Sequence, residues 1–192
     1  MKPAALRGRI WILVDATGRL IEDIDTDQIF HNAHLHITDL AQMGPLALGN
    51  LEGWKDFPRQ AAPGNIIVAG RNFGAGSSRQ QAVDCFLALG IAAIAAPSFS
   101  AIYFRNAVNS GFPVVRVAGL TQAVEAGLLH SGDEMEIDLR GGTGRVVVTD
   151  GQAVSDDRGA LTVEPMASVP FEIYRAGGLF AFGRRDKKLG AS

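Results

Sequence analysis

The sequence has one cysteine and no long hydrophobic run. Cys85 is the single cysteine among 192 residues, which excludes an internal disulfide framework and an iron–sulfur or zinc–thiolate site built by this chain alone. The longest apolar stretch, residues 85–99, is interrupted by Gly90 and Pro97 and falls short of the ~20 residues that span a bilayer. The first residues of the sequence lack the apolar segment of a secretory signal. We therefore expect a cytoplasmic protein.

The sequence also lacks an excess of either charge. Its 18 basic and 20 acidic residues give a net charge of -2, which offers no reason to expect nucleic acid or an anionic membrane as partner. The hydrophobic content of 47% and charged content of 20% are ordinary for a folded globular chain. This length suits one domain, or one core with an appendage. Cys85 falls on the apolar side of a predicted helix, so we expect it in the core.

Short apolar runs alternate with helical patterns through the first two thirds of the chain. The predicted strands cover residues 8–15, 65–69, 91–95 and 114–117, and the main helices cover residues 78–89 and 98–109. This order predicts a parallel βαβ core covered by helices. A short helix over residues 39–48 with Thr38 as its cap, and a long loop over residues 50–64, precede that core.

The last third changes character. A short helix is predicted over residues 121–128, and residues 134–139 alternate as a half-buried strand that turns at residues 141–144 into a second strand over residues 145–149. A helix over residues 169–176 follows, and the charged residues after Phe182 are expected to fray. The fold class is therefore α/β, with a parallel core, an antiparallel annex in one domain over residues 1–183, and a charged tail over residues 184–192.

A glycine-rich loop follows the apolar residues 66–69. It runs Gly74-Ala75-Gly76-Ser77-Ser78-Arg79 and leads into a helical pattern. The glycines allow close approach of a ligand, and two hydroxyls, one guanidinium and unpaired backbone N–H groups converge where a helix begins. This arrangement is suited to a carboxylate or a developing oxyanion. Ser77 with Gln80 also fits a capping box, so a purely structural serine stays open.

Several motifs in order carry a resemblance to a known family. They are residues 74–79, Ala96-Pro97-Ser98-Phe99-Ser100, Arg105-Asn106, Asn109-Ser110-Gly111, Asp25-Thr26-Asp27-Gln28-Ile29 and Ala176-Gly177-Gly178-Leu179. Together they resemble the small subunits of 3-isopropylmalate dehydratases, which are similar to the swivelling domain of aconitase. The resemblance runs from about Arg7 to Leu179 and implies a swivelling β/β/α fold.

The resemblance implies one half of a split hydro-lyase that isomerises a hydroxy acid, 2- to 3-isopropylmalate in leucine biosynthesis. A large subunit would carry a 4Fe–4S cluster that takes the leaving hydroxyl, and this chain would bind no cofactor or metal. By the family match Ser77 is the base, Ser78 a supporting group and Arg79 the clamp on a substrate carboxylate, a role that suits a planar guanidinium. Asp27 would orient the serine or the leaving water.

The substrate is left open by departures from the family pattern. His31 stands where relatives have proline, and His34-Leu35-His36 stand where relatives have a tyrosine–leucine pair and a specificity residue. His34 and His36 are therefore expected to face the variable part of the substrate. Gln80-Gln81 also replaces a Glu-His or Glu-Gln pair. A homoaconitate-, citramalate- or alkylmalate-type acid remains an alternative to isopropylmalate.

Other readings of the same residues remain. The three histidines have the right type for a metal site, although no acidic or thiolate partner stands at ligand spacing. Asp25 and Asp27 fit turn-bonding roles as well. We expect a group of polar residues, Asn72, Arg105, Asn106 and Asn109, to hold loops behind the site. A nucleotide-binding module, lacking the P-loop lysine, and a non-catalytic, anion-binding or regulatory subunit are the rival functions.

Overall fold

A computed structural model describes residues 1–150, 153–155 and 160–189, with side chains for residues 1–146 and 161–185. Four parallel strands form its centre in the order β1 (Ala5–Ile12), β2 (Ile66–Val68), β3 (Ala93–Ala96) and β4 (Val114–Ala118). Residues of β2 and β3 are buried throughout, as expected for parallel strands covered on both faces. The predicted parallel core of β2, β3 and β4 is confirmed, and β1 joins it as a fourth parallel strand.

The antiparallel part closes this sheet. Strand β5 (Glu134–Asp138) pairs with β1 and with β6 (Thr143–Asp150), while β8 (Ala160–Val163) pairs with β6 and β4. Among the described residues, seven strands thus form a closed ring, to which β7 (Ala153–Ser155) adds a hairpin. The predicted hairpin is present. The annex is not an appendage, however, because it joins both edges of the parallel core.

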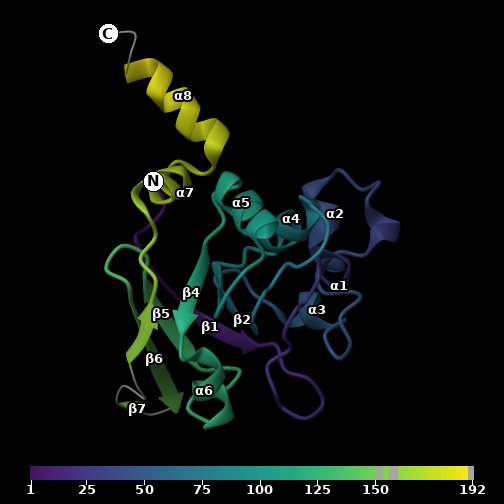
Figure 1. The fold of residues 1–192 in the computed structure, drawn as a ribbon, viewed down its shortest axis with the longest axis vertical. Helices are drawn as coiled ribbons and strands as arrows, with labels where there is room; N and C mark the ends of the chain where they lie inside the picture. The colour runs from purple at the N-terminus through teal and green to yellow at the C-terminus, as the bar shows by residue number, and fades with distance from the viewer. Residues whose placement is uncertain (151–152, 156–159, 190–192) are drawn as a thin grey trace.

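Two hydrophobic clusters lie on opposite faces of the parallel strands. Ile66, Val68 and Met135 belong to the cluster inside the closed sheet. Ile67 and Ile94 belong to the second cluster, which includes the apolar faces of α4 (Gln81–Ala88) and α5 (Ala101–Asn109). Alternation along each strand therefore supplies both cores. Figure 1 shows α4 and α5 on one side of these strands and β5, β6 and α6 (Leu120–Glu125) toward the other end of the molecule.

Several element boundaries differ from those predicted. Strand β1 begins three residues early and ends early, because its first half pairs with β5. The predicted helix over residues 39–48 divides into α2 (Leu40–Met43) and the 3₁₀ turn η2 (Gly44–Leu46), where Pro45 stands in the first turn. Asp39 and not Thr38 caps α2, since its side chain accepts the Ala41 N–H at 3.0 Å.

Two segments predicted without helix contain one. The expected loop over residues 50–64 includes α3 (Phe57–Gln60), which tolerates Pro58 in its first turn. After α7 (Ser168–Ala176) ends at Gly177, with a left-handed φ of 91°, α8 (Leu179–Leu189) projects beyond it (Figure 1). The expectation that the chain frays after Phe182 is therefore wrong as far as Leu189. No helix of the described residues could span a membrane.

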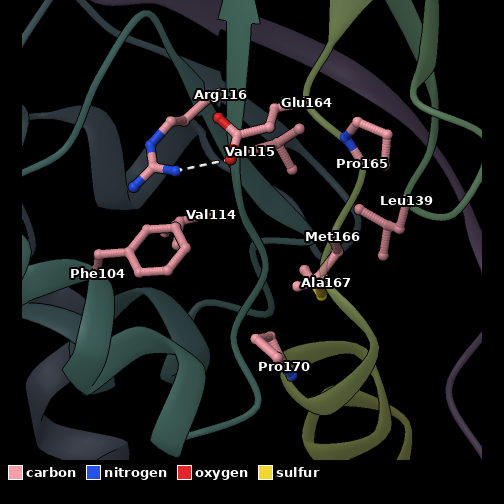
Figure 2. Close-up of a pocket in the computed structure, with 10 residues that line it drawn as sticks. All are labelled: Phe104, Val114, Val115, Arg116, Leu139, Glu164, Pro165, Met166, Ala167 and Pro170. Carbon is pink, nitrogen blue, oxygen red and sulfur yellow. Dashed lines mark hydrogen bonds and ion pairs between the residues drawn. The ribbon is translucent and has the colours of Figure 1, made fainter.

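A small hollow of about 170 Å³ lies between α5, β4 and residues 164–170 (Figure 2). Its lining is mainly apolar. Its two charged groups, Arg116 and Glu164, pair with each other at 2.9 Å, and Arg116 also lies 4.5 Å from the centre of the Phe104 ring. None of the residues predicted for the functional site lines this hollow.

Candidate functional site

The glycine-rich loop after β2 is held by backbone hydrogen bonds to residues 21–26. The N–H groups of Gly74 and Ala75 both donate to the carbonyl of Ile24, at 2.8 and 3.1 Å, and the N–H of Thr26 donates to Ala75 at 2.9 Å. Residues 25 and 75 thereby form a parallel bridge. These contacts bring the Asp25-Thr26-Asp27 motif beside the loop, as the family resemblance implies.

Gly74 and Gly76 are required by the shape of this loop. Both have left-handed φ values, 78° and 85°. A Cβ on Gly74 would stand 2.2 Å from the buried ring of Tyr103, whereas a Cβ on Gly76 would meet nothing closer than 3.6 Å. Gly74 therefore permits a close approach as well as an unusual backbone, while Gly76 serves the backbone alone.

Ser77 is exposed at the tip of the loop. Its backbone carbonyl accepts a hydrogen bond from the Thr26 hydroxyl at 3.1 Å. Helix α4 begins at Gln81, not at residue 78, and Gln80 makes no side-chain cap, so the predicted capping box between Ser77 and Gln80 is wrong. Within the described part of the chain, the N–H groups of residues 76–80 have no hydrogen-bond acceptor. These donors and the serine hydroxyl share one exposed turn.

The true capping box lies on the neighbouring segment. Asp25 caps α1 (Thr26–Ile29) by accepting the N–H groups of Asp27 and Gln28, both at 2.8 Å, and the Gln28 side chain accepts the Asp25 N–H at 2.9 Å. The turn-bonding interpretation of Asp25 is confirmed. Because this box fixes the first turn of α1, it aims the next carboxylate, that of Asp27, toward the glycine-rich loop.

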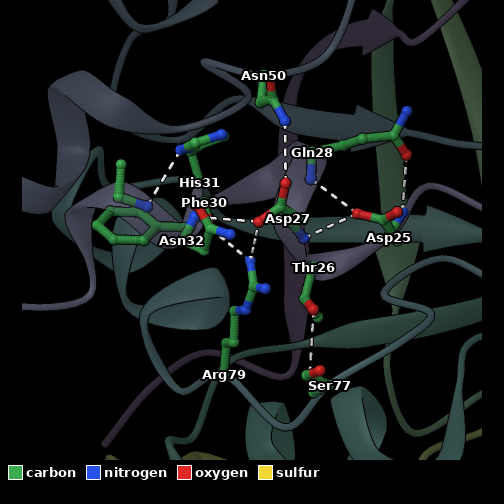
Figure 3. Close-up of polar contacts among 11 residues, drawn as sticks. Asp25, Thr26, Asp27, Gln28, Phe30, His31, Asn32, Asn50, Ser77 and Arg79 are labelled. Carbon is green, nitrogen blue, oxygen red and sulfur yellow. Dashed lines mark hydrogen bonds and ion pairs between the residues drawn. The ribbon is translucent and has the colours of Figure 1, made fainter.

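Asp27 and Arg79 form an ion pair (Figure 3). The Nη1 atom of Arg79 donates to Asp27 Oδ1 at 2.6 Å and to the carbonyl of Phe30 at 3.1 Å. The hydrogen bond from Arg79 lowers the pKa of the Asp27 carboxyl below its ordinary value, with further help from the Asn32 N–H and the His31 ring. Asp27 is therefore ionised at neutral pH.

The pairing bears on the roles predicted for these residues. Both described hydrogen bonds of the guanidinium use Nη1, and an arginine has five N–H donors in all. The Arg79 side chain is 15% exposed, so it is largely buried but still reaches solvent. Among the described residues no hydrogen bond joins Asp27 to Ser77, and its role in orienting the serine stays a prediction.

Polar side chains behind the loop connect it to α5. Asn106 donates to the Ser78 hydroxyl at 3.2 Å, and the Gln80 amide donates to Ser110 at 2.7 Å and to Asp84 at 2.8 Å. Asn72, itself at a φ of 57°, donates through its side chain to Asp23 and through its backbone to Ser98. Asn72 and Asn106 thus hold loops, as expected. Arg105 and Asn109 are exposed.

The histidine segment lies beside Asp27 and the start of α4: His31 acts on the Asp27 carboxylate, and the Gln81 side chain donates to the Leu35 carbonyl at 3.3 Å. His31 caps the 3₁₀ turn η1 (Asn32–His34) by accepting the Ala33 N–H at 3.1 Å. His34 is half-buried, its ring edge-on to Phe30, and His36 is exposed. The described residues contain no group of three or more His, Cys, Asp or Glu side chains arranged for a metal, so a metal site on the histidines is not supported.

Cys85 is a core residue. It is fully buried in the cluster beneath α4, and burial raises the pKa of its thiol far above the ordinary value. The structure confirms the core position that the sequence predicts. A buried thiol of this kind is not available as a ligand to a cluster.

Sequence reasoning missed Asn50, whose side chain donates to the second oxygen of Asp27 at 3.1 Å. It lies at the start of the loop predicted over residues 50–64, and no spacing or motif distinguishes it there. It also missed the direct pairing of Arg79 with Asp27. Opposite charges in two separated motifs were the one available signal, and such a signal does not specify a contact.

Comparison with known sequences identifies the class of protein to which this closed α/β fold and its exposed Gly-Ser-Ser-Arg loop belong. Residues 27–118, which include the loop, match the Aconitase C-terminal domain family. The 3-isopropylmalate dehydratase small subunit of Pyrobaculum calidifontis is 40% identical over 161 residues, covering 84% of this chain and 90% of the relative. That of Deinococcus deserti is 36% identical over 163 residues, covering 85% and 82%.

The structural comparison agrees. The fold is similar to a crystal structure of 3-isopropylmalate dehydratase from Methanocaldococcus jannaschii, with a TM-score of 0.78 and 29% identity over 97% of this chain and 98% of that one. The chain belongs to the family of 3-isopropylmalate dehydratase small subunits. It is thus an aconitase-family hydro-lyase subunit.

Proposed function

We propose that this chain is the small subunit of a two-chain enzyme that interconverts 2- and 3-isopropylmalate in leucine biosynthesis. The observation that carries the proposal is the exposed turn that holds the Ser77 hydroxyl and the N–H groups of residues 76–80, which have no acceptor among the described residues, next to Arg79, whose guanidinium pairs with Asp27. The names of the relatives supply the substrate. A swivelling motion of this domain over a partner belongs to the same proposal, as does a cytoplasmic location.

The proposal assigns the 4Fe–4S cluster to a large subunit. Cys85 is buried and its raised pKa keeps it a thiol, so this chain does not fit a thiolate-bound cluster. Bound on the partner, the cluster would supply a Lewis acid for the leaving hydroxyl.

The residues of this chain would handle the proton and the carboxylate. Removing a proton from the carbon next to a carboxylate requires a base held close to that carbon. The alkoxide of Ser77 would take this proton, and the adjacent N–H groups would stabilise the negative charge on its oxygen. Ser78, fixed by Asn106, would support it. Arg79 would bind a substrate carboxylate through the donors that Asp27 and Phe30 do not use.

The variable end of the substrate would face the histidine segment. His34 ends η1 and His36 lies two residues further on, on either side of Leu35, whose carbonyl accepts a hydrogen bond from Gln81 at the start of α4. An imidazole is neither a purely apolar wall nor a permanent charge at neutral pH. A homoaconitate-, citramalate- or alkylmalate-type acid is therefore the second candidate substrate, and a direct comparison of acids distinguishes the two.

The test is turnover by this chain co-expressed anaerobically with its large subunit, over a panel of isopropylmalate, citramalate and homoaconitate-type acids. We expect the isopropylmalates to be used best. Ser77→Ala should lower kcat by about 10²–10⁴-fold, the usual contribution of a general base, while Ser168→Ala, an exposed serine on α7, should leave it unchanged. Full activity of Ser77→Ala, or preference for another acid, would refute the base or the substrate respectively.

A further inference from the structure

The two carboxylate oxygens of Asp27 have different partners (Figure 3). Oδ1 accepts from Arg79 at 2.6 Å and from the Asn32 N–H at 3.0 Å, while Oδ2 accepts from the Asn50 side chain at 3.1 Å. A carboxylate held from both sides cannot rotate about its Cβ–Cγ bond without breaking a hydrogen bond. Asn50 therefore restricts the position of Oδ1, the oxygen that accepts the hydrogen bond from Arg79.

The place of Asn50 is fixed by a strained turn. Leu48, two residues earlier, is fully buried at a left-handed φ of 58°, which is unusual for a side chain of this size. Its N–H donates to the carbonyl of Ile29 in α1 at 2.8 Å, and Leu51 donates back to it at 3.0 Å. The turn is thus tied to the same helix that carries Asp27. Strain of this kind persists only where the surrounding structure holds it.

We propose that Asn50 is a positioning residue, which fixes the carboxylate of Asp27 and through it aims the guanidinium of Arg79 at the substrate carboxylate. The proposal rests on the function proposed above for Arg79. Its physical basis is that a planar guanidinium binds a carboxylate well only in a defined orientation. The Nη1 atom of Arg79 is held by Asp27 and Phe30. Because the guanidinium is planar, the orientation of Asp27 thus sets the direction in which the remaining N–H donors point.

The charged and titratable groups around Asp27 define a pH readout. Arg79 from the glycine-rich loop and His31 from the start of η1 face it, and both favour its ionised form. On its own segment, Asp25 is engaged by the backbone of α1. Loss of a donor to the carboxylate raises its pKa, and a second carboxylate beside it raises the pKa further. Removal of Asn50 should therefore be visible at Asp27 itself.

The experiment compares Asn50→Ala and Asn50→Asp with Gln42→Ala. Asn50→Asp keeps the shape and replaces the donor by a negative charge. Gln42 is a matched control because its exposed amide also donates to a carboxylate, that of Asp39, at 3.2 Å. The pKa of Asp27 is measured by carbon NMR titration of the full-length chain, and KM and kcat for 3-isopropylmalate are measured in the complex with the large subunit.

We expect the pKa of Asp27 to rise in Asn50→Ala and to rise more in Asn50→Asp, with Gln42→Ala unchanged. KM should increase about 3–10-fold in Asn50→Ala and more in Asn50→Asp, with a smaller fall in kcat. An unchanged pKa in both Asn50 variants, or an unchanged KM beside a lowered thermal stability, would overturn the proposal. If the wild-type complex does not turn over isopropylmalate, the proposed function fails, while the titration still decides whether Asn50 holds Asp27.

Discussion

Replacement of Gly74 by alanine tests how the glycine-rich loop is held against α5. The new Cβ would lie 2.2 Å from Cγ of Tyr103 and 2.5 Å from its Cβ. Tyr103 cannot give way easily, because its side chain is 1% exposed, its ring contacts Phe73 at 5.2 Å between centroids, and its hydroxyl donates to the Ala82 carbonyl at 3.2 Å. The substitution must therefore shift either the loop or the helix.

The expected cost has two parts. A left-handed backbone costs alanine about 1–2 kcal/mol, and forcing extra volume into a packed core costs about 1–3 kcal/mol. Gly74→Ala should thus lose about 2–5 kcal/mol of unfolding free energy. Gly76→Ala shares the left-handed backbone, at a φ of 85°, without the clash, and should lose only about 1–2 kcal/mol. The difference between the two variants isolates the contact with Tyr103.

Thermal unfolding of the isolated chain measures this difference. For a chain of this size 1 kcal/mol corresponds to about 2–4 °C in Tm, so we expect Tm to fall by about 4–20 °C in Gly74→Ala and by about 2–8 °C in Gly76→Ala. Circular dichroism and urea titration should rank the variants in the same order. A Gly74→Ala chain that melts at or above Gly76→Ala would refute the reasoning, since the close approach would then cost nothing.

Two further predictions concern single ionisable groups. The pKa of Asp27 is lower in the folded chain than in the unfolded one. Its contribution to stability is therefore present above its unfolded pKa of about 4 and disappears as the pH falls through the lower folded pKa. The difference in unfolding free energy between wild type and Asp27→Asn should shrink below about pH 4, and a constant difference from pH 7 to pH 2 would contradict this prediction. Because Cys85 is fully buried with a raised pKa, it should react with Ellman's reagent only after unfolding in guanidinium, and rapid labelling in native buffer would show that α4 opens or packs differently.

The parallel core and the glycine-rich loop could be predicted from the sequence because their signals are local. The buried runs of β2 and β3 and the helical spacing of α4 and α5 lie within short windows of sequence. The motif order then identified the family and, through the resemblance, named Ser77, Ser78 and Arg79 as candidate site residues, whose roles stay predictions. The predicted start of α4 is three residues early because residues 78–81 are all polar and carry no signal for the boundary, while in the structure the Arg79 side chain turns to Asp27 before the helix begins.

The features that were missed depend on distant partners. Closure of the sheet requires β1 to pair with β5 and β4 to pair with β8, and no local pattern specifies these pairs. Asn50 is one polar residue in a loop, and only the turn at Leu48 brings it to Asp27. Asp39 and Thr38 are both plausible caps for the helix that follows them, and the fold decides between them.

The closed sheet also determines the order in which strands can pair during synthesis. Strand β1 leaves the ribosome first, yet Ala5 pairs with Asp138 and Ile10 pairs with Ile66. At about 5–20 residues per second, Ala5 waits roughly 7–27 s for its antiparallel neighbour. During that interval one edge of β1 offers unpaired backbone groups to any passing strand. The nascent chain is therefore expected to be most exposed to strand mispairing until β5 emerges.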